Sequence, residues 1–309
     1  MLGTTRARRL HRLGAVAGLV GALALAGCYS DEGSNGYRSA VAVDVNAGGT
    51  VVVQATNAGQ TSRTFAVSTD DTWTPVGPAG PTVETTPIAV SDAGVVLGNT
   101  YDLTANVDTP FLWDAVQGYR TLQSVTGVAL PHPADMADDG SVVGSNGSSG
   151  RLWRPGSAVV DLAPLHPGGS VAVAAVNDQG QVVGASDGQA VLWEAPAYVP
   201  VVLDGAAAAV DINDAGTAIG LHVRWSADDH EATVVDGSLA AIGDDGTVVG
   251  TIDGEPVIWD ADTLEPHHPG SPADDGTGDV AAIDGQHVVG SAFGPGSGSD
   301  RHLIRYSRP

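Results

Sequence analysis

The stretch DINDAGTAIG, residues 211–220, contains two short apolar segments separated by a polar turn, and it decides the fold. Close variants recur as AVNDQGQVVG (175–184), DMADDGSVVG (135–144) and AIGDDGTVVG (241–250). An Asp or Asn that opens a turn bonds its own backbone, Gly accepts positive φ, and the β-branched residues that follow favour a buried strand. The stretch therefore predicts a β-hairpin with a three-residue or longer loop and a bulge. The closing Gly is expected to let the chain turn or let a neighbouring sheet approach closely.

The same phrase occurs seven times along the chain. The copies end at Val53, Gly98, Gly144, Gly184, Gly220, Gly250 and Gly290, with steps of 45, 46, 40, 36, 30 and 40 residues. A period near 40 residues is typical of four-stranded propeller blades. We therefore predict an all-β fold, a β-propeller of seven four-stranded blades over residues 39–309. The first, second and seventh copies are less regular, so the fold is better determined than the blade count.

A third strand carries an aromatic residue in every copy, as in PFLWDA, GRLWRP and PVIWDA. The positions are Phe65, Trp113, Trp153, Trp193, Trp225, Trp259 and Tyr306. We expect these side chains to pack between blades rather than to stack on a ligand. After residue 28 no stretch shows helix-length amphipathic periodicity. The seventh copy has no clear fourth strand, and a ring must not leave an open edge. Residues 37–42 are predicted to supply that strand.

Two phrases, Ile212-Asn213-Asp214-Ala215-Gly216 and Val176-Asn177-Asp178-Gln179-Gly180, followed by A-x-L-W, resemble the HAF-type family of extracellular repeats. The resemblance covers most of the chain beyond residue 39. It implies a secreted or surface β-propeller, and it implies no catalytic residue set. The first, third and seventh copies depart from the Asn-Asp pair of that family.

The first 27 residues have the pattern of a bacterial export signal. Four Arg precede an apolar run at 13–27, which is too short to span a bilayer core of about 30 Å. The end, Leu25-Ala26-Gly27-Cys28, resembles the lipobox, which implies cleavage before Cys28 and lipid on its sulfur. Cys28 is the only Cys, so no internal disulfide can form. We expect residues 28–38 to be a flexible tether, and an ordinary secretory or a twin-arginine signal remains the alternative.

Net charge excludes one class of partner. From residue 28 onward nine Arg face 36 Asp and Glu, a surface that repels phosphate backbones. We therefore expect no nucleic-acid binding. The expected location is the cell envelope, with the lipid in the outer side of the cytoplasmic membrane and the domain periplasmic or extracellular. We expect a monomer, and partners among envelope proteins or polysaccharides.

Motifs for chemistry are weak. The Asp-x-Gly turns lack the aromatic of a sialidase Asp box, and no G-x-S-x-G, H-E-x-x-H or P-loop is present. We predict no cofactor, no catalytic set and no strong metal site. A weak alternative is a calcium site at Asp274, Asp275 and Asp279 in the acidic stretch DDGTGD.

A ligand-contact loop is predicted from connection lengths. The connections between second and third strands are long in copies one, two and seven, which are neighbours in a closed ring, and short between them. Long loops in a compact domain are functional or merely mobile. We expect the long ones to form a lip whose candidate contacts are Tyr101, Asp102, Asn106, Asp108 and Phe293.

The sequence thus favours a lipid-anchored propeller that acts as a binding or interaction module rather than as an enzyme. The alternative is an envelope hydrolase acting on a sugar or an ester. An enzyme is expected to gather Asp, Glu or His at the mouth of the central channel. A binding module is expected to show a rim without such convergence.

Overall fold

The computed structural model describes residues 23–24, 37–57, 59, 61–78, 80–127, 132–269, 278–293 and 300–308. The predicted export signal and tether, Cys28 included, lie outside these residues except for 23–24 and 37–38. No helix among the described residues is long and apolar enough to cross a membrane.

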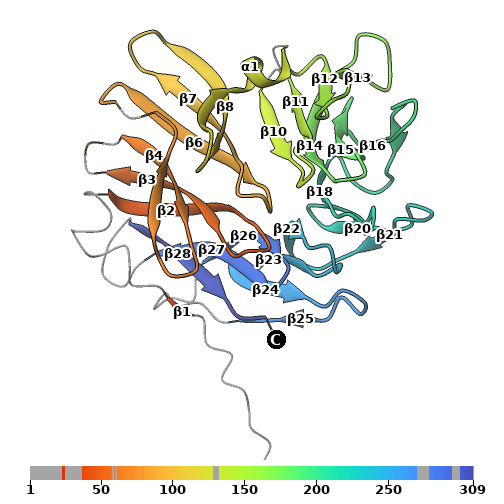
Figure 1. Ribbon diagram of the computed structural model, residues 1–309. Coiled ribbons are helices and arrows are strands. Elements are labelled where there is room, and N and C mark those ends of the chain that lie inside the picture. Colours follow the sequence, from red (N-terminus) through yellow and green to blue (C-terminus); the bar gives the residue numbers. More distant parts are fainter. Residues whose placement is uncertain are drawn as a thin grey trace, which may run out of the picture.

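Seven antiparallel sheets of four strands each form a ring around a central axis (Figure 1), which confirms the predicted propeller. The first blade contains β2 (Tyr37–Val45), β3 (Val51–Asn57), β4 (Ser62–Val67) and β5 (Trp73–Val76). The second contains β6 (Val83–Val90), β7 (Val96–Asp102), β8 (Val107–Asp114) and β9 (Gly118–Thr121). The third contains β10 (Pro133–Met136), β11 (Val142–Ser145), β12 (Gly150–Trp153) and β13 (Val160–Leu162).

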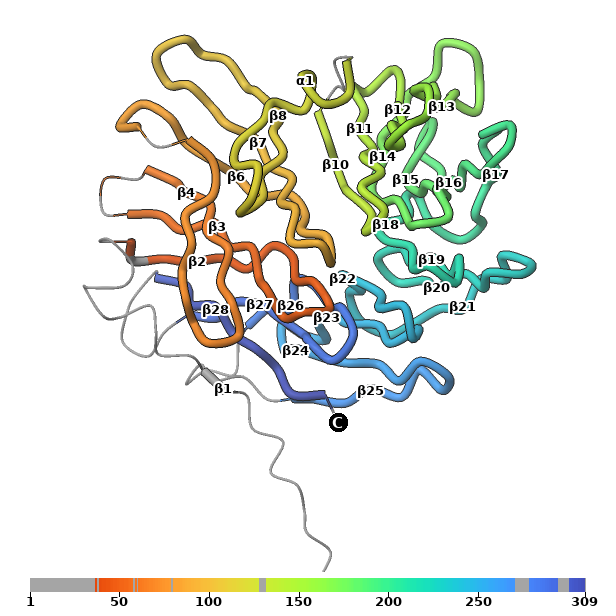
Figure 2. Tube along the Cα trace, in the orientation of Figure 1, coloured from red at the N-terminus to blue at the C-terminus, as the bar shows by residue number. Residues whose placement is uncertain are grey.

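The remaining blades repeat this order around the ring (Figure 2). The fourth contains β14 (Val171–Val176), β15 (Val182–Ser186), β16 (Gln189–Trp193) and β17 (Val201–Val202). The fifth contains β18 (Ala209–Ile212), β19 (Ala218–Gly220), β20 (Val223–Trp225) and β21 (Ala232–Val234). The sixth contains β22 (Ser238–Ile242), β23 (Val248–Ile252), β24 (Glu255–Trp259) and β25 (Pro266–His267). The seventh contains β26 (Asp279–Asp284), β27 (His287–Phe293), β28 (Arg301–Tyr306) and β1 (Leu23–Ala24).

The repeated phrase forms the inner hairpin of each blade. In the fifth blade the N–H of Gly216 donates to the carbonyl of Asn213 at 2.9 Å, and the N–H of Asn213 donates to the carbonyl of Thr217 at 3.1 Å. Gly216 has φ +85°, a conformation that L side chains rarely adopt. The predicted three-residue turn with a left-handed Gly is therefore confirmed.

Every inner strand also carries a register shift against its second strand, as in the fourth blade between Val173 and Ala175. Such a bulge bends the strand and turns one residue away from the ladder. The closing Gly of the phrase lies opposite it, and the close approach there comes from the inner strand of the same blade. A Cβ on Gly184 would lie 2.2 Å from the carbonyl oxygen of Ala172. The predicted close approach is thus real, but it does not come from a neighbouring sheet.

The aromatic of the third strand packs between blades, as predicted. Trp193 and Trp225 are fully buried. The indole N–H of Trp193 donates to the backbone carbonyl of Ala163, just after the last strand of the preceding blade, at 2.8 Å. That of Trp225 donates to the backbone carbonyl of Asp204, just after the last strand of its preceding blade, at 2.7 Å. A buried indole needs such a partner, so each one ties two blades together.

The prediction that residues 37–42 supply the fourth strand of the seventh blade was wrong. Residues 37–42 belong to β2, the inner strand of the first blade, while β1 pairs with β28 as the fourth strand of the seventh blade. Cleavage before Cys28 would remove β1. The two ends of the ring are also joined without it, because Ala42 N–H donates to the hydroxyl of Ser291 at 2.9 Å and the Arg305 guanidinium donates to the carbonyl of Gly49 at 2.8 Å.

The structure adds one element that the sequence did not predict. The helix α1 (Leu122–Thr126) begins after Thr121, whose hydroxyl accepts a hydrogen bond from the N–H of Ser124, and ends at Gly127 with φ +73°. It follows the last strand of the second blade (Figure 1), and its Leu122 is buried in a cluster with Leu112 of the second blade and Met136 of the third.

Candidate functional site

A channel of about 260 Å³ runs along the axis, lined by the inner strands and their turns. In six of the seven blades the residue that the bulge displaces from the ladder lines this channel: Val43, Ile88, Ala174, Val210, Ala240 and Ala281. The channel wall is therefore aliphatic at this level, because the bulge recurs at the same position in all seven blades.

One mouth of the channel is ringed by carboxylates. The turn residue that follows the Asn position of the repeat is Asp92, Asp138, Asp178, Asp214 or Asp244 in blades two to six, and the shorter turn of blade seven supplies Asp284. Blade one has Ala47 there. Because the turns are equivalent, the ring symmetry brings residues 30 to 46 positions apart in the chain to one opening.

Hydrogen bonds between blades hold these carboxylates in place. The N–H of Asp178 donates to Oδ1 of Asp214, and the N–H of Asp214 donates to Oδ1 of Asp244, each at 2.9 Å. The N–H of Asp92 donates to Oδ1 of Asp138 at 2.5 Å. One oxygen of each accepting carboxylate is thus committed to the neighbouring blade, so the ring both closes the blade interfaces and fixes the direction of the second oxygen.

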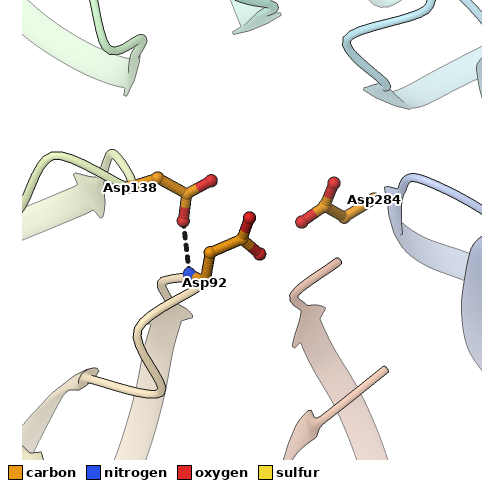
Figure 3. Close-up of side chains that lie close together, drawn as sticks. All are labelled: Asp92, Asp138 and Asp284. Carbon is orange, nitrogen blue, oxygen red and sulfur yellow. Dashed lines mark hydrogen bonds between the residues drawn. The ribbon is translucent and has the colours of Figure 1, made fainter. Parts of the chain in front are cut away.

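Three of the carboxylates come especially close. Asp92, Asp138 and Asp284 each offer an oxygen, and these oxygens all lie within 4.8 Å of one another. Figure 3 shows their side chains pointing toward one another from three separate turns. Asp92 and Asp138 are exposed and Asp284 is half-buried, so the group is open to solvent. Oxygen-only groups of this kind suit hard cations such as Ca²⁺.

The mutual proximity of these groups alters their protonation. Desolvation, together with the neighbouring carboxylates, raises the pKa of Asp138 to about 6 and that of Asp284 to about 7. Like charges at short range disfavour the ionised form. A proton or a bound cation relieves that repulsion.

A second set of carboxyls lies deeper in the channel wall. Asp44, Asp135 and Asp211 follow the bulges of the first, third and fifth blades and are partly buried. Each accepts the N–H of the next blade through Oδ2, from Val90, Val176 and Ile242 at 2.7, 2.9 and 2.8 Å. Desolvation raises the pKa of Asp44 to about 8, of Asp211 to about 7 and of Asp135 to about 6, against those hydrogen bonds.

The predicted lip lies at the opposite ends of the blades and is built differently from what was expected. The segment expected as a long loop in the second blade is mostly strand, because β7 and β8 pair from Val96↔Trp113 to Asp102↔Val107. Tyr101, Asp102 and Asp108 therefore belong to strands. Asn106 sits in the turn with φ +56° and lies against the Tyr101 hydroxyl.

Phe293 ends β27 on the seventh blade, is 46% exposed, and has the Arg301 guanidinium 5.5 Å above its ring. Part of the third long connection, 294–299, lies outside the described residues. Whether these five residues contact a ligand stays a prediction.

The weak calcium candidates are not brought together by the described structure. Asp274 and Asp275 lie outside the described residues. Asp279 begins β26 and pairs with the guanidinium of Arg301, while its Oδ1 accepts the N–H of Ser291 at 2.6 Å. Asp279 is therefore engaged within its own blade.

The channel carboxylates were missed because each Asp was interpreted only as a turn former. The available signal was the constancy of its position: equivalent turn positions in a closed ring must face one axis. Acids do converge at the channel mouth, which is the arrangement expected of an enzyme, and a hydrolase is therefore kept as a candidate.

Taken together, the ring, its repeat and its axial channel define the chain as a seven-bladed β-propeller. No family model and no curated protein matches it. Solved structures are similar in fold. A streptogramin B lyase matches at 12% identity over 93% of this chain and 97% of that chain, with a TM-score of 0.55.

Two further structures match at a similar level. A chain of a mitotic checkpoint complex matches at 13% identity over the whole of both chains, with a TM-score of 0.53. An inactive virginiamycin B lyase from Staphylococcus aureus, solved with quinupristin, matches at 12% identity over 93% of this chain and 98% of that chain, with a TM-score of 0.51. Identities this low show the fold alone.

Proposed function

We propose that the protein is a ligand-binding propeller of the cell envelope whose acidic channel mouth holds a divalent cation. The observation that carries the proposal is the group Asp92, Asp138 and Asp284, with oxygens within 4.8 Å of one another at the mouth of the channel. The neighbouring blades fix these carboxylates through backbone N–H groups, so little side-chain entropy is lost when a cation binds.

Calcium should stabilise the fold through this group. With the protein first treated with a chelator at pH 7, we expect 1 mM calcium chloride to raise the melting temperature by about 5 °C, because a ligand that binds only the folded state adds about 2.7 kcal/mol at one hundred times its Kd. Differential scanning fluorimetry measures the shift, and adding the chelator again should reverse it.

The variant Asp138→Asn should remove most of that shift. The control is Asp139→Asn, which changes the same charge in the same turn but at a carboxylate that faces Arg154 at 3.0 Å instead of the channel group. The proposal fails if calcium has no effect on the wild type, or if both variants keep the full shift.

The envelope location is proposed from the sequence, since Cys28 lies outside the described residues. We expect the expressed wild type to partition into the detergent phase and Cys28→Ala to remain in the aqueous phase or uncleaved, because two or three acyl chains hold a protein firmly to a membrane. Equal partitioning of the two forms in a Triton X-114 separation would contradict the anchor. This outcome is independent of the calcium result.

A hydrolase is the second candidate, because carboxyls with pKa values of about 6 and 7 at one opening suit general acid–base chemistry. The two functions are separable. Turnover of a chromogenic glycoside or ester that Asp284→Asn abolishes would favour the hydrolase, whereas calcium-dependent stabilisation without turnover would favour the binding module.

A further inference from the structure

A groove of about 760 Å³ opens between the fifth and sixth blades, at the ends of the strands opposite the carboxylate mouth. β22 begins beside it at Ser238 and ends at Ile242, just before the turn that carries Asp244. The groove is therefore separate from the channel group and does not depend on it. Its size is within the range of ligand sites, about 300–1,000 Å³.

The groove exists because the connections around it are short. The fifth and sixth copies of the repeat are separated by 30 residues, the shortest step in the chain. Only residues 235–237 join β21 to β22, and only residues 221 and 222 join β19 to β20. Nothing in these short connections is long enough to fold over the turn between β23 and β24.

The fourth blade shows what covers an equivalent turn when the connection is longer. Its turn between β15 and β16 carries Asp187, with φ +52°, and residues 163–170 lead into the blade. The Asp187 carboxylate accepts the N–H of Ser170 at 2.7 Å, the N–H of His166 at 3.2 Å, and contacts the His166 ring nitrogen Nδ1 at 3.0 Å. These donors lower the pKa of Asp187.

Asp253 holds the same place in the sixth blade. It also has φ +52°, is followed by Gly254 at φ +82°, and its flanking pair Ile252↔Glu255 corresponds to Ser186↔Gln189 in the fourth blade. Asp253 is exposed on the groove wall, and among the described residues no backbone N–H is directed at its carboxylate. Within the described part of the chain, this position is filled by the chain's own loop in the fourth blade and is left open in the sixth.

The rest of the wall specifies the ligand further. Asp236 adds a second exposed carboxylate, the hydroxyls of Ser238 and Thr251 add polar contacts, and Val234, which is 83% exposed, adds an apolar surface. We propose that this groove binds an extended peptide segment that carries an Arg or Lys side chain. The peptide N–H groups replace those that the residues 166–170 offer to Asp187, and the cationic side chain pairs with the two carboxylates.

The test uses a fluorescein-labelled probe, acetyl-Leu-Arg-Pro-Gly-Gly-Ser-amide, which follows the sequence of residues 165–170 with Arg in place of His. Fluorescence anisotropy with the full-length protein should show saturable binding that weakens as sodium chloride is raised. Asp253→Asn should weaken binding about ten-fold, which corresponds to the loss of one charge-assisted contact. Asn tolerates positive φ, so the turn should stay intact.

Two matched controls make the result specific. Asp228→Asn removes an exposed carboxylate outside the groove and should leave the association constant unchanged. A probe with Gln in place of Arg should bind the wild type about ten-fold more weakly. The proposal is overturned if the probe does not saturate, if the two protein variants bind alike, or if neutral oligosaccharides rather than the peptide bind in a manner that depends on Asp253.

Discussion

The free energy of unfolding is expected to fall as the pH rises from about 4 to about 8 in the presence of a chelator. Asp44, Asp211 and Asp135 have pKa values of about 8, 7 and 6 in the fold, against 3.8 for an unperturbed Asp. Between the two values the folded chain binds more protons than the unfolded chain, so each unit of pH lowers its stability. Below pH 4 carboxylates with lowered pKa, such as Asp114 and Asp187, become protonated and the stability falls again.

The expected change in the free energy of unfolding with pH is large. One pKa unit corresponds to about 1.4 kcal/mol, so the shift of Asp44 from 3.8 to about 8 sets an upper limit of about 6 kcal/mol for that residue alone. Partial exposure to the channel reduces that limit, and we expect about 5 kcal/mol from the three groups together. Thermal melts between pH 4 and pH 8 should record a fall of about 10 °C.

The variant Asp44→Asn separates the cause from other pH effects. In the wild type the N–H of Val90 donates to Oδ2 of Asp44 at 2.7 Å. Asn keeps one oxygen that can accept this hydrogen bond, but its side chain cannot ionise. We expect the variant to be more stable than the wild type at pH 8 and no more stable at pH 4. Asp228→Asn, at an exposed site, should leave the slope unchanged. A wild-type stability that rises steadily from pH 4 to pH 8 would contradict this account.

The fold was accessible from the sequence because its determinants are local. The turn at Asp214 to Gly216 needs only an Asx side chain, a left-handed Gly and two short strands, and its seven-fold recurrence predicts the ring. The third-strand Trp was equally accessible, since a large apolar residue at one fixed strand position can hardly avoid a blade interface. The strand that closes the ring could not be predicted from the sequence. β1 pairs through only two residues, Leu23↔Arg305 and Ala24↔Ile304, and so short a pairing leaves no recognisable sequence pattern.

The candidate sites were less accessible because they arise between blades. Asp92 and Asp284 are almost two hundred positions apart, and only closure of the ring makes them neighbours. The groove beside Asp253 depends on what the adjacent connections fail to cover, a property of loop length and not of residue type. Strand extension accounts for the expected lip, since the residues after Gly98 continue to alternate and pair with β8 instead of leaving the sheet.

Gly184→Ala is expected to cost about 3 kcal/mol in the free energy of unfolding, although the change adds a single methyl group. A Cβ at this position would lie 2.2 Å from the carbonyl oxygen of Ala172 and 2.9 Å from the Cα of Val173. Both atoms belong to the backbone of the inner strand, so relief requires the bulge between Val173 and Ala175 to move. Overpacking of this kind costs 1–3 kcal/mol when side chains can adjust, and a backbone obstacle places the cost at about the upper end.

The matched control is Gly80→Ala, where the nearest atom to a new Cβ is Cγ2 of Val83 at 3.7 Å, an ordinary contact. We expect this change to leave the stability within about 0.5 kcal/mol of the wild type. Chemical denaturation of the two variants gives the comparison directly. Since Gly250 and Gly290 stand in the same relation to their own inner strands, with a Cβ placed 2.0 and 1.9 Å from a backbone oxygen, Ala at either should repeat the loss seen at Gly184. Equal stabilities for Gly184→Ala and Gly80→Ala would mean that the bulge leaves room for a Cβ at the closing Gly. The recurrence of this Gly in the repeat would then need another physical reason.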